Sequence, residues 1–146
     1  MRKSIGVIVG LALTTAFFAG CGSKPTMEES IAAIEKLGGG FSDDGKVLEF
    51  MSTEITDAGL VHLEGMTGLE QLYLFNTNIT GAGLAHLKGL TGLKLLDLQN
   101  IKITDAELTH LEGMTGLEKL NLHGTGTTDA GVDNLQAALP ECTINH

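Results

Sequence analysis

The feature that most constrains the fold is a repeat of 24 residues, which runs without a gap from Asp43 to about Gln136. Three successive copies begin with Thr-Gly-Leu, at Thr67, Thr91 and Thr115, and a degenerate copy over residues 43–66 precedes them. Self-similarity at such a period is typical of solenoids, in which one repeat cannot bury its apolar side chains alone. The repeats therefore have to stack to make a continuous core.

Each copy contains two different apolar periodicities. The first part has the spacing Leu-x-x-Leu-x-Leu, as at Leu69, Leu72 and Leu74. Alternation places the last two of these leucines on one buried face of a strand. In the second part, apolar residues such as Leu84 and Leu87 recur at near-helical intervals. Each copy is therefore expected to form a strand, a turn, a short helix and a second turn.

Polar residues and glycines mark the ends of the expected helices. The threonines that fit N-caps are Thr56, Thr80, Thr104 and Thr128. The aspartates that follow an N-cap, where the helix dipole favours an anion, are Asp57, Asp105 and Asp129. The glycines that fit helix C-termini in need of a left-handed residue are Gly65, Gly89 and Gly113.

The pattern L-x-x-L-x-L-x-x-(T/N)-x-(I/L) resembles the leucine-rich-repeat family over about 100 residues. The run Ile-Thr-Asp-Ala-Gly-Leu at 55–60 looks like a 24-residue subtype that is frequent in bacterial repeat proteins and similar to the ribonuclease-inhibitor-like class. The resemblance implies an α/β solenoid with a parallel sheet on the concave face and short helices on the convex face. Ile101, Thr127, Gly81 and Glu107 depart from the pattern, which indicates drift within the array.

Both ends of the array need covers. Residues 26–29 read Thr-Met-Glu-Glu, a capping-box start, and three glycines stop the following segment at Gly38. The apolar residues on one face of that segment are Ile31, Ile34 and Leu37. We therefore expect a capping helix within residues 26–40 and a repeat domain over 41–146. Near the C-terminus a closing strand is expected, with Cys142, as a buried thiol, and Ile144 at the paired-leucine positions.

The first twenty residues read as a secretory signal peptide. A basic start is followed by an apolar stretch, Ile5 to Phe18, which as a helix would rise only about 21 Å and fall short of the hydrocarbon core. Residues 18–21, Phe-Ala-Gly-Cys, resemble the lipobox of bacterial lipoproteins, although the family prefers Leu at Phe18. The resemblance implies a signal peptide over 1–20, an acylated Cys21 with a tether over 21–25, and, because Gly22 follows, the outer membrane where the host has one. The alternative is an ordinary cleaved signal followed by an incidental cysteine.

The charge balance narrows the class of partner. The formal net charge is −9, and removal of Arg2 and Lys3 with the signal leaves −11. Such a chain is not expected to bind nucleic acid or to dock electrostatically on anionic lipids. It contains no nucleophile elbow, phosphate loop, dinucleotide fingerprint or zinc motif, so we expect no enzyme activity and no cofactor.

A histidine every 24 residues invites a metal hypothesis, because His62, His86 and His110 would stack along the helices. Zinc needs nitrogen ligands at about 2.0–2.1 Å, whereas packed helices stand about 8–10 Å apart. Partly polar helix positions explain the histidines more simply, and no metal site is expected.

Residues that face out of the predicted sheet form rows across the strands. Lys46, Glu70, Lys94 and Glu118 alternate in sign, which predicts supporting ion pairs between neighbouring strands. Other rows place apolar bulk on a face open to solvent, a feature that favours an interaction surface. The candidate protein-binding residues are Met51, Tyr73, Phe75, Leu95, Asp97, Gln99, Asn121 and His123. The alternative is that a short solenoid tolerates a few apolar residues there.

The sequence thus favours a lipid-anchored envelope protein that binds another protein through its concave repeat face. Its expected partners are a protein and, through the lipid, a membrane. A structural or self-assembling envelope component is the second hypothesis, and a metal-binding or enzymatic protein is the third.

Overall fold

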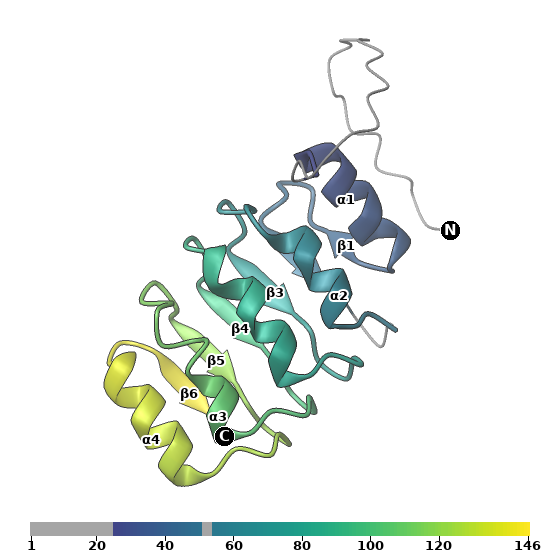
Figure 1. Cartoon of the computed structure of the whole chain (residues 1–146). Coiled ribbons are helices and arrows are strands. Elements are labelled where there is room, and N and C mark those ends of the chain that lie inside the picture. The colour runs from purple at the N-terminus through teal and green to yellow at the C-terminus, as the bar shows by residue number, and fades with distance from the viewer. Residues whose placement is uncertain (1–24, 51–53) are drawn as a thin grey trace, which may run out of the picture.

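The computed structural model, which describes residues 25–50 and 54–146, arranges the chain in two layers, a sheet and a row of helices (Figure 1). The sheet has six strands in chain order, with β1 antiparallel to β2 and every later pair parallel. The strands are β1 (Gly40–Phe41), β2 (Val47–Glu49), β3 (Gln71–Tyr73), β4 (Leu95–Asp97), β5 (Lys119–Asn121) and β6 (Thr143–Asn145). From β2 to β6 each residue pairs with the one 24 positions later, as Leu72 does with Leu96, so the repeat period sets the register.

The second layer consists of short helices on one side of the sheet (Figure 1). They are α1 (Met27–Lys36), α2 (Asp57–Leu60), the 3₁₀-helices η1 (Val61–Leu63) and η2 (Gly81–Gly89), α3 (Asp105–Leu108) and α4 (Asp129–Ala138). A parallel sheet with one helical segment per repeat confirms the predicted α/β solenoid.

The core lies between the two layers and consists mainly of leucine columns. Leu48, Leu72, Leu96 and Leu120 face it from the strands and are fully buried, and each pairs in register with the next. The helical segments contribute buried residues such as Leu60, Leu84 and Leu108 to the same cluster. Full burial of one leucine side chain contributes about 1.5–3 kcal/mol, so the stacked columns supply the main stabilising term.

The N-terminal cover follows the capping pattern. The backbone N–H of Thr26 donates to Glu29 Oε2 over 2.8 Å, and the backbone N–H of Glu29 donates to Thr26 Oγ1 over 3.3 Å. α1 buries Ile34 in the core, where it lies close to Gly39, and a side chain at Gly39 would collide with Ile34 and Phe50. The helix and the β1–β2 hairpin therefore close the first coil.

The C-terminal cover matches the sequence expectation only in part. Ile144 lies in β6 and pairs with Leu120, as predicted. Cys142 is 4% exposed, but it lies in the turn before β6 and does not take a paired-leucine position. Its thiol is free, and burial raises its pKa.

The left-handed residues differ from those expected. Gly65 has φ +90°, but Gly89 and Gly113 do not adopt positive φ, so the predicted C-cap geometry is wrong for these two. Around Gly89 the helix is a 3₁₀-helix, and the Leu90 N–H closes it by donating to the Leu87 carbonyl over 3.0 Å. The turns after the strands need the left-handed conformation instead, and it is adopted by Asn76 (φ 55°), Asn100 (φ 58°) and Gly124 (φ 71°).

Two of the aspartates assigned to helix dipoles bind the next coil. Asp57 accepts hydrogen bonds from the backbone N–H and the hydroxyl of Thr80, over 2.7 and 2.6 Å. Asp105 accepts the same pair from Thr128, over 2.8 and 2.7 Å. Each carboxylate therefore fixes the start of the following helix and joins two coils, a role that the dipole argument missed.

The departures from the repeat pattern at Gly81 and Glu107 compensate each other, because Glu107 takes over the hydrogen-bonding role of the missing aspartate. Thr104 has no aspartate at position 81 to bind, and its N–H and hydroxyl donate to Glu107 of its own coil, over 2.9 and 2.7 Å. A side chain at Gly81 would collide with Glu107. In the other two junctions the relation is reversed, because a side chain at Gly83 or Gly131 would collide with the aspartate of the preceding coil. Each junction between the helices of adjacent coils thus contains one carboxylate, supplied either by the preceding helix (Asp57, Asp105) or by the following one (Glu107).

Charged residues at the strand entrances form part of the predicted ladder. Glu70 pairs with Lys46 over 2.6 Å and with Lys94 over 3.0 Å. Glu118 forms no ion pair within the part of the chain that the structure describes. Hydrogen bonds from the two lysines lower the pKa of Glu70, and the bond to Glu70 raises the pKa of Lys46.

We predict that Gly81→Asp and Glu107→Gly each destabilise the protein, whereas the double variant recovers stability. The first change brings two carboxylates into one place, and the second removes the hydrogen-bond acceptor of Thr104. Together they recreate the Asp105–Thr128 arrangement. Urea unfolding of the wild type and the three variants should give a coupling free energy of about 1 kcal/mol or more in favour of the double variant. Additive effects would contradict the exchange.

We also predict a pH-dependent contribution from Glu70. Its folded-state pKa is lowered, so its stabilising effect is present above the unfolded value of about 4.3 and is lost as the pH falls through the folded value. The difference in free energy of unfolding between wild type and Glu70→Gln should therefore favour the wild type at neutral pH and shrink at acid pH and high salt. Glu118→Gln, at the same position two coils later, is the control. A difference that stays constant from neutral to acid pH would refute this.

Candidate functional site

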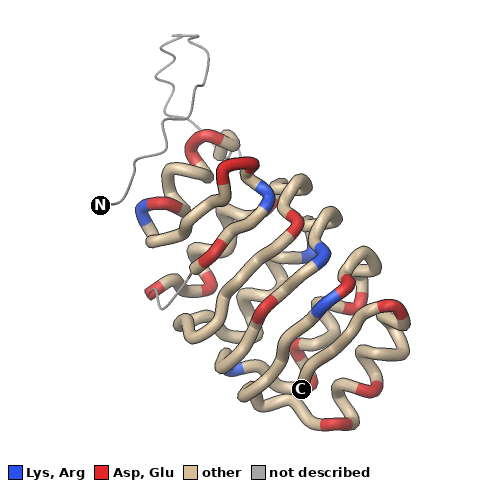
Figure 2. The backbone as a smooth tube through the Cα atoms, turned by 180° about the vertical axis from the view of Figure 1, so that it is seen from behind, with Lys and Arg blue, Asp and Glu red and all other residues tan. Residues whose placement is uncertain are grey.

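No helix of the described residues covers the outer side of the sheet, which Figure 2 views from behind Figure 1. We call this surface the sheet face and define it by the outward residues of β2 to β5 and by the residue two positions after the end of each of β3, β4 and β5. The sheet face consists of Val47, Glu49, Gln71, Tyr73, Phe75, Leu95, Asp97, Gln99, Lys119, Asn121 and His123. Parallel register sets Val47, Gln71, Leu95 and Lys119 in one row, and Glu49, Tyr73, Asp97 and Asn121 in the next.

The apolar candidates lie on this face, but they are half-buried and not fully open. Tyr73, Phe75 and Leu95 each retain part of their accessible surface. Strands about 4.8 Å apart bring the flanking side chains against them, which explains the partial cover. The Tyr73 hydroxyl donates to Gln71 Oε1 over 3.0 Å, so its ring leans along its own strand. Met51, the remaining apolar candidate, lies outside the described residues.

Two polar candidates, Asp97 and Asn121, also have a structural role. Asp97 Oδ1 accepts the backbone N–H of Gln99 over 3.0 Å, and Asn121 Oδ1 accepts that of His123 over 3.1 Å. Each bond closes a short turn at the end of its strand. Gln99 is half-buried and His123 is exposed, so their side chains remain accessible. A sequence signal was available, because an Asx residue two positions before a backbone amide often makes this bond.

The helix side carries the three histidines, and they do not form one site. His86 Nδ1 lies 2.9 Å from Glu64 Oε1, an ion pair when the ring is protonated. His62 is half-buried, and its Nδ1 has no hydrogen-bond partner within the described residues. Among residues 25–50 and 54–146, no group of three or more His, Cys, Asp or Glu side chains is placed to hold a metal ion.

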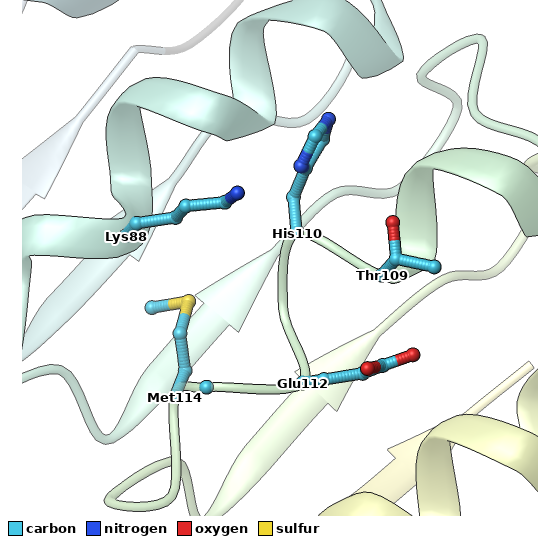
Figure 3. A pocket seen from close by; sticks show the side chains of 6 residues that line it. Lys88, Thr109, His110, Glu112 and Met114 are labelled. Carbon is cyan, nitrogen blue, oxygen red and sulfur yellow. The ribbon is translucent and has the colours of Figure 1, made fainter.

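His110 contributes instead to a shallow pocket of about 280 Å³ on the helix side. Figure 3 shows Lys88 reaching toward His110, while Glu112 points away from Lys88. The Thr109 hydroxyl, also at this pocket, donates to the Ala106 carbonyl over 2.9 Å. Among the residues that line this pocket, no nucleophile is hydrogen-bonded to a base.

No helix in the described part of the chain has the length and apolar content needed to cross a membrane.

One family model and several solved structures match parts of this chain. The family model for leucine-rich repeats matches residues 67–126. Among solved structures, a leucine-rich-repeat protein of Leptospira interrogans is 19% identical with a TM-score of 0.44, covering 59% of this chain and 27% of that one. An internalin of Listeria monocytogenes is 19% identical with a TM-score of 0.34, covering 58% and 36%. The chain therefore spans much less than two thirds of either neighbour. Curated proteins gave no match.

The strand register, the buried leucine columns and the family match over residues 67–126 lead to one conclusion. The described part of this chain folds as a leucine-rich-repeat solenoid.

Proposed function

We propose that this protein is a recognition module that binds another protein through the sheet face and is held at a bacterial envelope by a lipid on Cys21. Leucine-rich repeats generally act in protein recognition, which supports the first half. The observation that carries the proposal is the group of Tyr73, Phe75 and Leu95, which keep accessible surface on a side of the sheet without a covering helix.

The backbone beneath this group favours binding because it is already ordered. Tyr73 and Leu95 belong to β3 and β4, whose ladder bonds continue on both sides, and the Leu74 N–H donates to the Asp97 carbonyl over 2.9 Å. A rigid scaffold loses little conformational entropy when a partner docks. Half-buried aromatic residues in such a place are typical anchors of protein interfaces.

Binding explains the arrangement better than catalysis does. Asp97 and Asn121 use one oxygen each for the strand ends, and Glu70 is engaged by two lysines. These polar groups thus support the scaffold. The accessible apolar surface of the sheet face suits contact with another protein.

The envelope location rests on the sequence of residues 1–21, which lie outside the described part. The signal-like stretch and the lipobox-like residues 18–21 support export and acylation. Only residues 22–25 would separate the lipid from Thr26, the N-cap of α1, so the first coil would lie close to the membrane. Acyl chains contribute about 0.8 kcal/mol for each buried CH₂, enough in combination to hold a small domain.

We predict that Tyr73→Ala with Phe75→Ala abolishes capture of the partner from envelope extract by the Cys21→Ala chain. The double change removes the aromatic surface and leaves the buried leucines in place. Val61→Ala is the matched control, because Val61 is an apolar residue, 39% exposed, on the helix side. Urea unfolding should show that all the proteins remain folded.

Unchanged capture by the aromatic double variant would exclude the sheet face as the binding surface. Concentration-dependent self-association of the purified chain, with no partner recovered from extract, would instead support the structural role.

We predict further that Cys21→Ala moves the protein from the membrane fraction to the soluble fraction and prevents labelling by radioactive palmitate. Cys142→Ala is the matched control and should change neither result, since the thiol of Cys142 is buried in the domain. Persistent membrane association of Cys21→Ala would disprove the lipid anchor.

A further inference from the structure

Tyr73 stands between two carboxylates on the sheet face. Parallel register pairs Glu49 with Tyr73 and Tyr73 with Asp97, so the three residues form one row across β2, β3 and β4. All three point to the same side of the sheet, because they occupy equivalent strand positions. With neighbouring strands about 4.8 Å apart, both acidic side chains lie within reach of the ring.

The row keeps an uncompensated negative charge. Within the described residues, the Glu49 carboxylate has no hydrogen bond or ion pair, and Glu49 is exposed. Asp97 uses Oδ1 for the Gln99 N–H, which leaves Oδ2 available. The lysines at the strand entrances do not neutralise them, since Lys46 and Lys94 are both bound to Glu70.

Lys119 lies on the same face, in the neighbouring row, and forms no ion pair with any described residue. The row of Glu49, Tyr73 and Asp97 thus combines an accessible aromatic ring with two carboxylates whose charge the protein itself does not balance.

This combination selects for a cation. An aromatic face attracts a positive group within about 6 Å of its centre, and carboxylates add charge-assisted hydrogen bonds. Arginine fits both features better than lysine, because its planar guanidinium stacks on rings and donates in several directions at once.

We infer that the partner docks an arginine side chain onto Tyr73, between Glu49 and Asp97. The inference rests on the proposed function, because it names the chemistry of the partner at the same face.

The test uses the full chain in neutral detergent and two short peptides as probes. One is acetyl-Gly-Arg-Gly amide, and the other carries citrulline, a neutral analogue of nearly the same shape. In an NMR titration, the arginine peptide should shift the signals of Glu49, Tyr73 and Asp97. Its dissociation constant should lie in the millimolar range, about tenfold below that of the citrulline peptide. Raising the salt concentration should weaken the arginine peptide alone.

Glu49→Gln with Asp97→Asn is the informative variant. It removes both charges while keeping the side-chain oxygen that accepts the Gln99 N–H, so the scaffold is preserved. The preference for arginine over citrulline should disappear in it. Glu112→Gln with Asp133→Asn, which changes two exposed carboxylates of the helix side, is the matched control and should retain the preference.

Equal affinity for the two peptides, or shifts spread evenly over all the carboxylates, would overturn the inference. So would an undiminished preference in the Glu49/Asp97 variant. Such a result leaves the proposed function standing if the Tyr73/Phe75 variant still loses its protein partner, so the two failures are distinguishable.

Discussion

A single coil of this chain cannot cover its own leucines, and that constraint accounts for most of the architecture. Leu72 is buried because Leu48 and Leu96 pack against it in register, and the same holds at each later coil. The coils at the ends have only one neighbour. α1 with β1 closes one end and α4 with β6 closes the other, so the caps are as necessary to the core as the repeats. The hydrophobic term fixes the stacking, and the carboxylate of Asp57 or Asp105 then fixes how the helices of adjacent coils meet.

The alternation of the strands separates stability from recognition. Every second side chain enters the leucine columns, where a change in volume is felt by two neighbouring coils. The intervening side chains contact solvent on the sheet face, and their rows vary in chemistry from Val47 to Lys119. A partner surface can therefore be formed on β2 to β5 without disturbing the interior. Tyr73 is an example: its backbone is held by the strands on both sides, while its side chain keeps accessible surface.

Sequence periodicity predicted the strands, their parallel register and the buried leucines, because one regular pattern specifies all three. It did not predict contacts between adjacent coils. Asp57 lies in the first turn of α2, as predicted, but its hydrogen bond with Thr80 was not predicted. Gly89 looked like a left-handed C-cap, but a 3₁₀-helix ends there without one. Of the candidate site, the residues of the sheet face were placed correctly on one surface, whereas the half-burial of Tyr73 and the backbone bond of Asp97 depend on three-dimensional neighbours.

The single carboxylate at each junction has a consequence for how such an array can change length. If residues 81–104 were lost alone, Asp57 would face Glu107 across the new junction, with two carboxylates in one place. If residues 105–128 were lost alone, Gly81 would face Gly131, and Thr104 would have no acceptor. Loss or duplication of both coils together, residues 81–128, recreates junctions of the Asp–Gly kind that already exist. Within residues 81–128, the unit that recombination can copy or delete without a mismatch is thus a pair of repeats, although the visible period is one.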